Sequence, residues 1–202
     1  MTQTSLVFAG GLCLAALLGA SCSSAPYSSA HGNQGVRVFG TVWNDGDTKS
    51  TFTPGGATSK PETDVTGIGA AYEQFLGEGF SWTAAIERRN YETQAGADLD
   101  ANELRFGLRG YLGPQEKLQP FVTVEGFYGD GLDASSAPDS DSYLGIAVGG
   151  GLAWWPSKDI SLEAGLLYET TLSNPETDLG GGNVREDEIS GLTARIGVGF
   201  WF

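Results

Sequence analysis

Eleven charged residues of both signs recur in the patterned segments of the chain, and they are the first candidates for chemistry. Paired glutamates can act as general acid and base, and arginine can hold an anion. The same residue types form buried ion pairs where both signs are enclosed together. These residues are Arg37, Glu73, Glu87, Arg89, Glu103, Arg105, Arg109, Glu125, Glu163, Glu169 and Arg195. The elements that carry them decide between the two interpretations.

Other catalytic or cofactor-binding patterns find little support. The single histidine, His31, precedes the first patterned segment, although a serine–histidine hydrolase needs a histidine beside its nucleophile. The glycine runs at 149–151 and 180–182 lack the lysine and helix of a phosphate loop. We therefore expect a protein that is not an enzyme, with no catalytic residues and no cofactor.

Aspartates in two polar stretches are weak candidates for Ca²⁺ ligands, because Ca²⁺ prefers oxygen donors. They are Asp45, Asp47, Asp139 and Asp141. Neither stretch has the spacing of an EF-hand. Acidic loops rich in glycine and serine are also explained by solubility and mobility alone, so we predict no dedicated metal site.

Eight stretches with period-two alternation carry the charged residues, and this period indicates β-strands. Most are long enough to cross a bilayer as tilted strands, which takes about 9–11 residues. The stretches are Gly35–Trp43, Val65–Phe75, Phe80–Tyr91, Ala101–Leu112, Pro120–Tyr128, Tyr143–Trp155, Ile160–Thr170 and Ile189–Phe202.

Short and long connections alternate between these stretches. The short ones are LGEG, GPQEK and PSKD, and the long ones are Asn44–Asp64, Glu92–Asp100, Gly129–Ser142 and Thr171–Glu188. Outer-membrane barrels show this alternation. We therefore predict an all-β fold, an eight-stranded antiparallel up-and-down transmembrane β-barrel.

One face of each stretch is apolar and the other carries glycine, hydroxyl and charged residues. A transmembrane barrel turns its apolar face to the lipid, so the charged face should line the lumen. Because eight strands enclose only enough room for side chains, we expect the eleven charged residues to form salt bridges there. Arg88 falls on the apolar face, near a strand end where it could meet lipid phosphate.

Aromatic residues gather at the predicted strand ends, which suggests girdles at both membrane interfaces. On the short-turn side are Phe75, Phe80, Trp82, Tyr111, Phe121, Trp154, Phe200 and Phe202. On the long-loop side are Trp43, Tyr72, Tyr91, Phe127, Tyr128, Tyr143 and Tyr168.

The N-terminus is typical of an export signal, with an apolar run over Leu6–Ala20 followed by small residues. We assign 1–30 to a signal peptide and 31–202 to the barrel domain. Two processing routes stay open: lipidation of Cys22 after cleavage before it, or ordinary cleavage between Ser21 and Ala30. The excess of 25 acidic over 11 basic residues disfavours a nucleic-acid partner.

The last eight residues, RIGVGFWF, resemble the C-terminal sorting signal of bacterial outer-membrane barrels, with Arg195, Gly197, Phe200 and Phe202 at the specified positions. The runs at 120–129 and 149–164 resemble the OmpA/OmpX-like family of small barrels. This resemblance implies a place in the outer-membrane lipid of a bacterium and assembly by the barrel assembly machinery. The even strand number puts both termini in the periplasm and the long loops outside.

The long loops hold most of the charge, with sixteen acidic and three basic residues. We interpret the protein as a non-enzymatic barrel that presents acidic extracellular loops for surface interaction or envelope integrity. The alternatives are a narrow porin-like channel, a lipid-modifying enzyme and a soluble periplasmic barrel that binds an apolar ligand. The sequence names no extracellular partner.

Overall fold

A computed structural model describes residues 33–59, 62–77, 79–93, 98–113, 117–130, 133–134 and 141–202. The predicted signal peptide, which includes Cys22, lies outside these residues, and so does His31. The described part of the chain consists of strands and the turns that join them. It contains no helix with the length and apolar character needed to cross a membrane.

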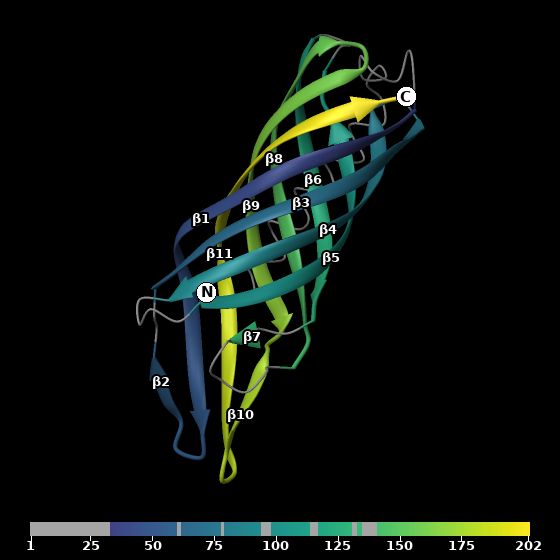
Figure 1. Cartoon of the computed structure of the whole chain (residues 1–202). Coiled ribbons are helices and arrows are strands. Elements are labelled where there is room, and N and C mark those ends of the chain that lie inside the picture. The colour runs from purple at the N-terminus through teal and green to yellow at the C-terminus, as the bar shows by residue number, and fades with distance from the viewer. Residues whose placement is uncertain are drawn as a thin grey trace.

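The strands form one closed antiparallel barrel (Figure 1). Each wall strand pairs with its neighbours along the chain, and the last pairs with the first from Gly35↔Trp201 onward, which closes the ring. The eight wall strands are β1 (Gln34–Thr53), β3 (Glu62–Gly77), β4 (Phe80–Thr93), β5 (Asp98–Tyr111), β6 (Leu118–Gly129), β8 (Tyr143–Ser157), β9 (Ile160–Ser173) and β11 (Asn183–Trp201). The fold predicted from the alternation is confirmed, with one strand for each stretch.

Along the strands, exposed apolar side chains alternate with buried polar ones. This arrangement is stable only when the outside of the barrel meets lipid. Outward side chains such as Ile196 and Ile68 are 67% and 65% exposed, whereas the inward Arg105 is 1% exposed. A protein surrounded by water would bury the first kind and expose the second. The ring satisfies its own backbone hydrogen bonds and presents an apolar outer wall, as a transmembrane β-barrel must.

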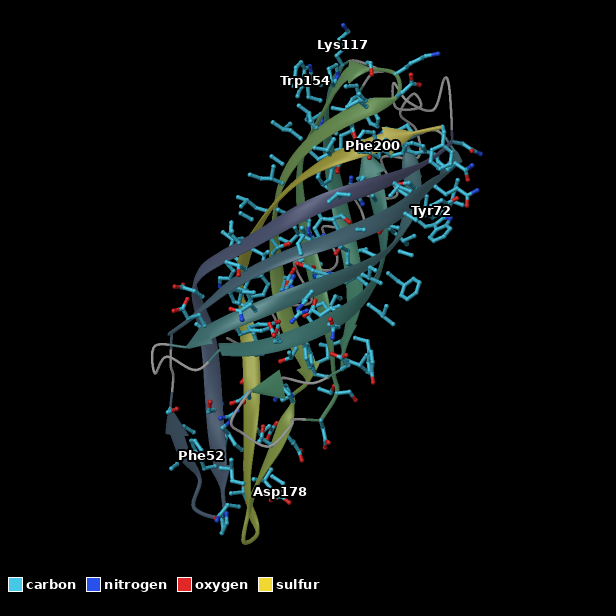
Figure 2. The ribbon with its side chains drawn as sticks, in the orientation of Figure 1. Phe52, Tyr72, Lys117, Trp154, Asp178 and Phe200 are labelled. Carbon is cyan, nitrogen blue, oxygen red and sulfur yellow. The ribbon has the colours of Figure 1, made fainter. Side chains whose placement is uncertain are left out.

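Half of the girdle prediction is wrong, because seven of the fifteen aromatic residues point into the barrel. These are Trp43, Phe75, Tyr91, Tyr111, Phe121, Phe127 and Tyr143, each at most 6% exposed. The physical reason is strand parity, since Tyr111 lies two residues after the inward Arg109. Tyr72 was also assigned to the wrong end: it faces outward near the short turns, close to Phe200 and on the side of Lys117 (Figure 2).

Glycines on the inner face make room for these large rings. A Cβ added at Gly145 would overlap the ring of Phe127, and one at Gly191 would overlap the indole of Trp43. These two rings therefore lie against a glycine of the adjacent strand, a pairing that lets a narrow barrel hold aromatic residues. The same kind of contact with an aromatic ring occurs at other inward glycines, such as Gly69 beside Phe39 and Gly129 beside Tyr143.

Two long connections are more ordered than loops. Beyond the barrel, β1 and β11 stay paired as far as Thr53↔Val184, and each gains an outer partner, β2 (Ala57–Ser59) and β10 (Glu176–Gly180). We call these four neighbouring segments the β extension; it projects from the end opposite the C-terminus (Figure 1). A further short strand, β7 (Asp133–Ala134), pairs with β5 on the same side.

Candidate functional site

The charged residues chosen from the sequence all lie inside the barrel, and each is buried and ion-paired. They fall into two groups along the axis. We call the first the short-turn cluster and the second the loop-side cluster. The short-turn cluster consists of Arg37, Glu73, Arg109 and Glu163. The loop-side cluster consists of Glu87, Arg89, Glu103, Arg105, Glu125, Glu169 and Arg195.

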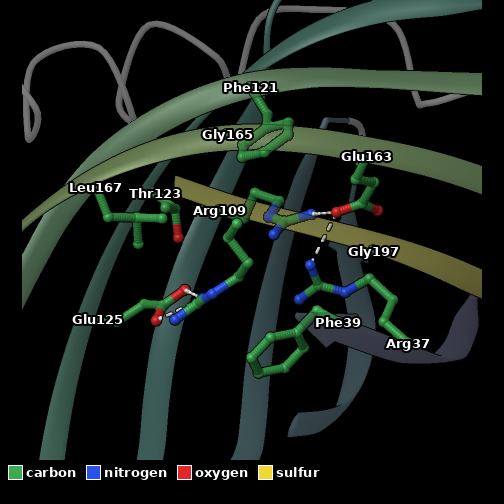
Figure 3. A pocket seen from close by; sticks show the side chains of 11 residues that line it. Arg37, Phe39, Arg109, Phe121, Thr123, Glu125, Glu163, Gly165, Leu167 and Gly197 are labelled. Atoms are coloured by element: carbon green, nitrogen blue, oxygen red, sulfur yellow. Dashed lines mark hydrogen bonds and ion pairs between the residues drawn. The ribbon is translucent and has the colours of Figure 1, made fainter. Parts of the chain in front are cut away.

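In the short-turn cluster, Glu163 joins two arginines. Its Oε2 accepts hydrogen bonds from Arg37 Nη1 at 2.8 Å and from Arg109 Nη1 at 2.6 Å (Figure 3). Glu73 lies 3.1 Å from the Nε of Arg37, and its other oxygen accepts hydrogen bonds from Ser81 and Tyr111. Two positive and two negative charges therefore balance in this cluster.

The loop-side cluster is built around Arg105. Its guanidinium contacts four carboxylates: those of Glu103 and Glu169 at 2.7 Å, Glu125 at 3.1 Å and Glu87 at 3.2 Å. The ring of Phe127 lies beneath it, 4.7 Å from the guanidinium carbon. An arginine that is almost fully buried tolerates this position because several carboxylates compensate its charge at once.

The other two arginines complete this cluster, and two tyrosines assist. Arg89 contacts Glu169 at 2.6 Å and Glu103 at 3.3 Å. Arg195 Nη1 donates to both oxygens of Glu125, at 3.0 and 3.1 Å. The hydroxyls of Tyr91 and Tyr143 donate to Oε1 of Glu103 at 3.2 and 2.9 Å. Four glutamates against three arginines leave this cluster one negative charge in excess.

Apolar layers close the lumen at both ends of the charged region. The short-turn layer is mostly aromatic and consists of Phe75, Tyr111, Phe121, Ala153, Trp155 and Trp201. The loop-side layer consists of Trp43, Val65, Tyr91, Ala101, Phe127, Tyr143, Ala147, Leu167 and Ile189. The rings in the first layer touch, and the centroids of Trp155 and Trp201 are 4.9 Å apart. These layers keep water from the ion pairs and so strengthen them.

The charged residues between these layers are closely packed, since each is at most 8% exposed. A cavity of about 20 Å³ lies between the two clusters, beside Arg109 and Arg195 (Figure 3). Another of about 10 Å³ lies beside Trp43 and Arg89. A cavity of roughly 10–15 Å³ holds a single water molecule. The described lumen is therefore a packed, charged core rather than an open channel.

Sequence reasoning missed several polar residues that belong to the charged core. Ser81 and Ser161 donate to Glu73 and Glu163, and the indole of Trp201 donates to Ser161 at 2.9 Å. Their signal was present, because they share strand parity with the charged residues. The selection rested on charge alone and so passed over the hydroxyls.

Of the remaining candidates, Gly197 lies on the wall of the lumen, others lie outside the lumen, and the rest fall outside the described residues. Phe200 and Phe202 point outward, 53% and 62% exposed, while Gly197 packs against Phe39 on the inner face. Asp141 is exposed ahead of β8. The side chains of Asp45 and Asp47, and all of Asp139, lie outside the described residues. Within the described ranges, no three acidic, histidine or cysteine side chains are placed to hold a metal ion.

Comparison with solved structures finds the same fold in small outer-membrane barrels. The outer membrane protein OprG from Pseudomonas aeruginosa superposes with a TM-score of 0.62 at 16% identity, covering 85% of this chain and 96% of that one. The outer membrane protein AlkL, in its solid-state NMR structure in lipid bilayers, gives 0.51 at 16% identity, covering 85% and 92%. No protein-family model matches the chain, and no curated protein matches it. The resemblance to small eight-stranded outer-membrane barrels is confirmed as a likeness of fold.

Proposed function

We propose that the chain is an integral, non-enzymatic protein of the bacterial outer membrane, whose barrel anchors the β extension rigidly and conducts no ions. The observation that carries this proposal is the filled lumen. Two ion-paired clusters lie between two apolar layers, their charged residues are each at most 8% exposed, and the two cavities described beside them measure about 20 and 10 Å³. A channel would need a continuous polar path, whereas an anchor needs stiffness. The fold shared with OprG and AlkL supports the location.

The first expected result concerns conduction. The refolded protein should insert into planar lipid bilayers without producing discrete single-channel steps, because ion passage would require both apolar layers and both clusters to move. Insertion is checked on the same preparation by the shift in gel mobility between unheated and boiled samples. Reproducible unitary steps from heat-modifiable protein would contradict the anchor and favour the narrow pore.

The alternation of short and long connections supports an orientation with both termini in the periplasm and the β extension outside. In a Cys22→Ser background, Lys49→Cys should react with a membrane-impermeant maleimide in intact cells, because Lys49 is half exposed on the β extension. Lys117→Cys, at the short-turn side, should react only after the envelope is opened. The reverse pattern would invert the orientation.

The outer face of the β extension supplies the acidic surface that we propose for surface interaction or envelope integrity. Glu176 and Glu186 lie directly opposite each other on β10 and β11. Glu188, further along β11, pairs with Lys49 at 3.7 Å. Like charges on directly paired strands are unfavourable, so this face is better suited to meeting cations or basic groups than to packing.

Two further proposals concern assembly and the enzyme alternative. The outward aromatic side chains of Phe200 and Phe202 are exposed at the membrane wall, and we propose that the barrel assembly machinery recognises this terminus. A lipid-modifying activity has less support. The only histidine, His31, lies outside the described residues, and the buried carboxylates are engaged by arginines.

A further inference from the structure

A groove crosses the outer wall of the barrel near its loop side. It has a volume of about 640 Å³, within the range of about 300–1,000 Å³ typical of ligand sites. Its apolar part is one cross-strand row of directly paired residues running from β1 to β6. The row consists of Val38, Ala70, Ile86, Leu104 and Tyr128. The small Ala70 between larger neighbours makes the row concave, as an acyl chain requires.

The next cross-strand row changes from apolar to polar and holds Arg88. Arg88 is paired with Ile68 on β3 and with Asn102 on β5. Asn102 in turn accepts a hydrogen bond from the backbone of Asp130 at 3.2 Å and donates one from its side chain to the Asp130 carboxylate. All four residues line the groove. The groove therefore has an apolar row beside a polar rim. This matches a lipid, which has an apolar acyl chain next to a polar headgroup.

Arg88 points outward, unlike the five arginines of the interior. Its Nη2 lies 3.0 Å from Oδ2 of Asp100, and the two side chains remain 68% and 46% exposed. Asn90 donates to the other oxygen of Asp100 at 3.4 Å, which holds this carboxylate beside the guanidinium. Arg88 and Asp130 line the groove, and Asp100 lies next to Arg88 just beyond the lining, so one cation and two carboxylates meet at this edge.

We propose that this groove binds a membrane lipid whose headgroup carries both a phosphate and a primary ammonium. The phosphate meets Arg88, the ammonium meets Asp100, and an acyl chain fills the apolar row. The assignment rests on the proposed function, because it needs the barrel to stand in a lipid bilayer. Charge complementarity selects this headgroup. A purely anionic headgroup would face two carboxylates, and a quaternary ammonium has no N–H to donate to them.

The test measures which lipid the folded barrel retains. The full-length protein is reconstituted in vesicles with equal parts of phosphatidylethanolamine, phosphatidylglycerol and phosphatidylcholine of identical chains. It is then extracted in mild detergent, and bound lipid is counted by native mass spectrometry. We expect phosphatidylethanolamine to exceed each competitor about five-fold, the upper end of what one exposed ion pair contributes, because only its ammonium can pair with Asp100. Equal retention, or preference for either competitor, would overturn the proposal.

Variants assign the effect to the groove. Asp100→Asn should remove most of the preference, because it removes the partner of the ammonium. Arg88→Gln should lower the retention of all three lipids, because each carries the phosphate that Arg88 meets, and Leu104→Trp should also reduce retention of every lipid by filling the apolar row. Lys49→Gln is the matched control, because it removes an exposed, ion-paired cation on the β extension. An unchanged preference in Asp100→Asn, or unchanged retention in Arg88→Gln, would overturn the site.

The same preparations separate this inference from the proposed function. A barrel that shows the heat-dependent mobility shift but retains no preferred lipid leaves the membrane anchor intact and removes only the lipid site. A chain without the mobility shift, which retains no lipid at all, contradicts the proposed function itself.

Discussion

Replacing Arg105 with glutamine should lower the free energy of unfolding of the barrel by about 3–5 kcal/mol, the usual cost of removing one partner from a buried ion pair. Arg105 contacts four carboxylates within 3.2 Å and is 1% exposed. Without it, two arginines remain against the four glutamates of the loop-side cluster, and the excess of negative charge grows from one to two. Glutamine offers hydrogen bonds but no compensating charge.

Urea titration of the protein folded in phospholipid vesicles, followed by tryptophan fluorescence, measures the change in the free energy of unfolding. Arg88→Gln is the matched control, since the same substitution there removes an outward guanidinium paired with one exposed carboxylate. It should change stability by less than about 1 kcal/mol. Adding Glu169→Gln to Arg105→Gln should restore part of the loss by rebalancing the charge. Equal, small effects of both arginine substitutions would indicate a hydrated lumen.

The composition of the charged core was accessible from the sequence, whereas its pairing was not. Period-two alternation places every candidate on one face, and eight strands leave that face only the lumen. Which charges meet depends on the stagger between strands. Arg105 and Glu169 lie 64 residues apart and touch at 2.7 Å across the barrel. No spacing rule along the chain predicts that contact.

The aromatic residues show where a compositional preference misled the sequence analysis. Tyr111 and Phe121 alternate with charged or hydroxyl residues, so parity alone placed them inside. We nevertheless predicted that both residues face the membrane interface, because aromatic residues form girdles there. In the structure both rings contact arginine, and Arg109 lies 4.1 Å above the ring of Phe121. Rings that combine apolar bulk with a negative face are suited to filling a lumen that also contains guanidinium groups.

The strands of the β extension were not predicted from the sequence, and the reason is different. Its strands are rich in Asp, Glu, Ser and Thr, and residues 54–56 and 181–182 carry turn signals, so the local sequence indicates loops. The strands form because β1 and β11 are already paired in the barrel and continue that ladder outward. Inward positions there are still filled: Asp187 is buried and bonded to Ser50 at 2.6 Å. Tertiary pairing overrides the local preference.

The ion-paired core also bears on how the barrel selects one register. A one-residue slip between neighbouring strands would turn charged side chains toward lipid, and a two-residue slip would remove Arg105 from its four carboxylates. Buried ion pairs are weak evidence for stability in themselves. In this lumen, the ion pairs disfavour every other stagger between the strands, because another stagger would separate the charges. The uniform apolar outer face does not distinguish between staggers in this way.

Replacing Gly151 with alanine should be among the most damaging single changes in the barrel, even though it adds one methyl group. A Cβ at this inward position would overlap the carbonyl oxygen of Ala164 and lie 2.6 Å from Cα of Gly165 and 2.8 Å from the ring of Phe121. The first two are backbone atoms of β9, so no rotamer relieves them. We expect a loss of about 3 kcal/mol in the free energy of unfolding, measured in the same urea titration.

Gly126→Ala provides the control, because it makes the same substitution on the outward face, where a Cβ would have only the carbonyl oxygen of Gly145 within 4 Å, at 3.9 Å. Neither glycine has a positive φ, so backbone strain does not distinguish them. The outward alanine should leave stability unchanged or raise it slightly, because glycine is a poor strand residue. If both alanines were tolerated equally, β8 and β9 would not be in close contact. The lumen would then be wider than described, and it would not force the charged and aromatic side chains together.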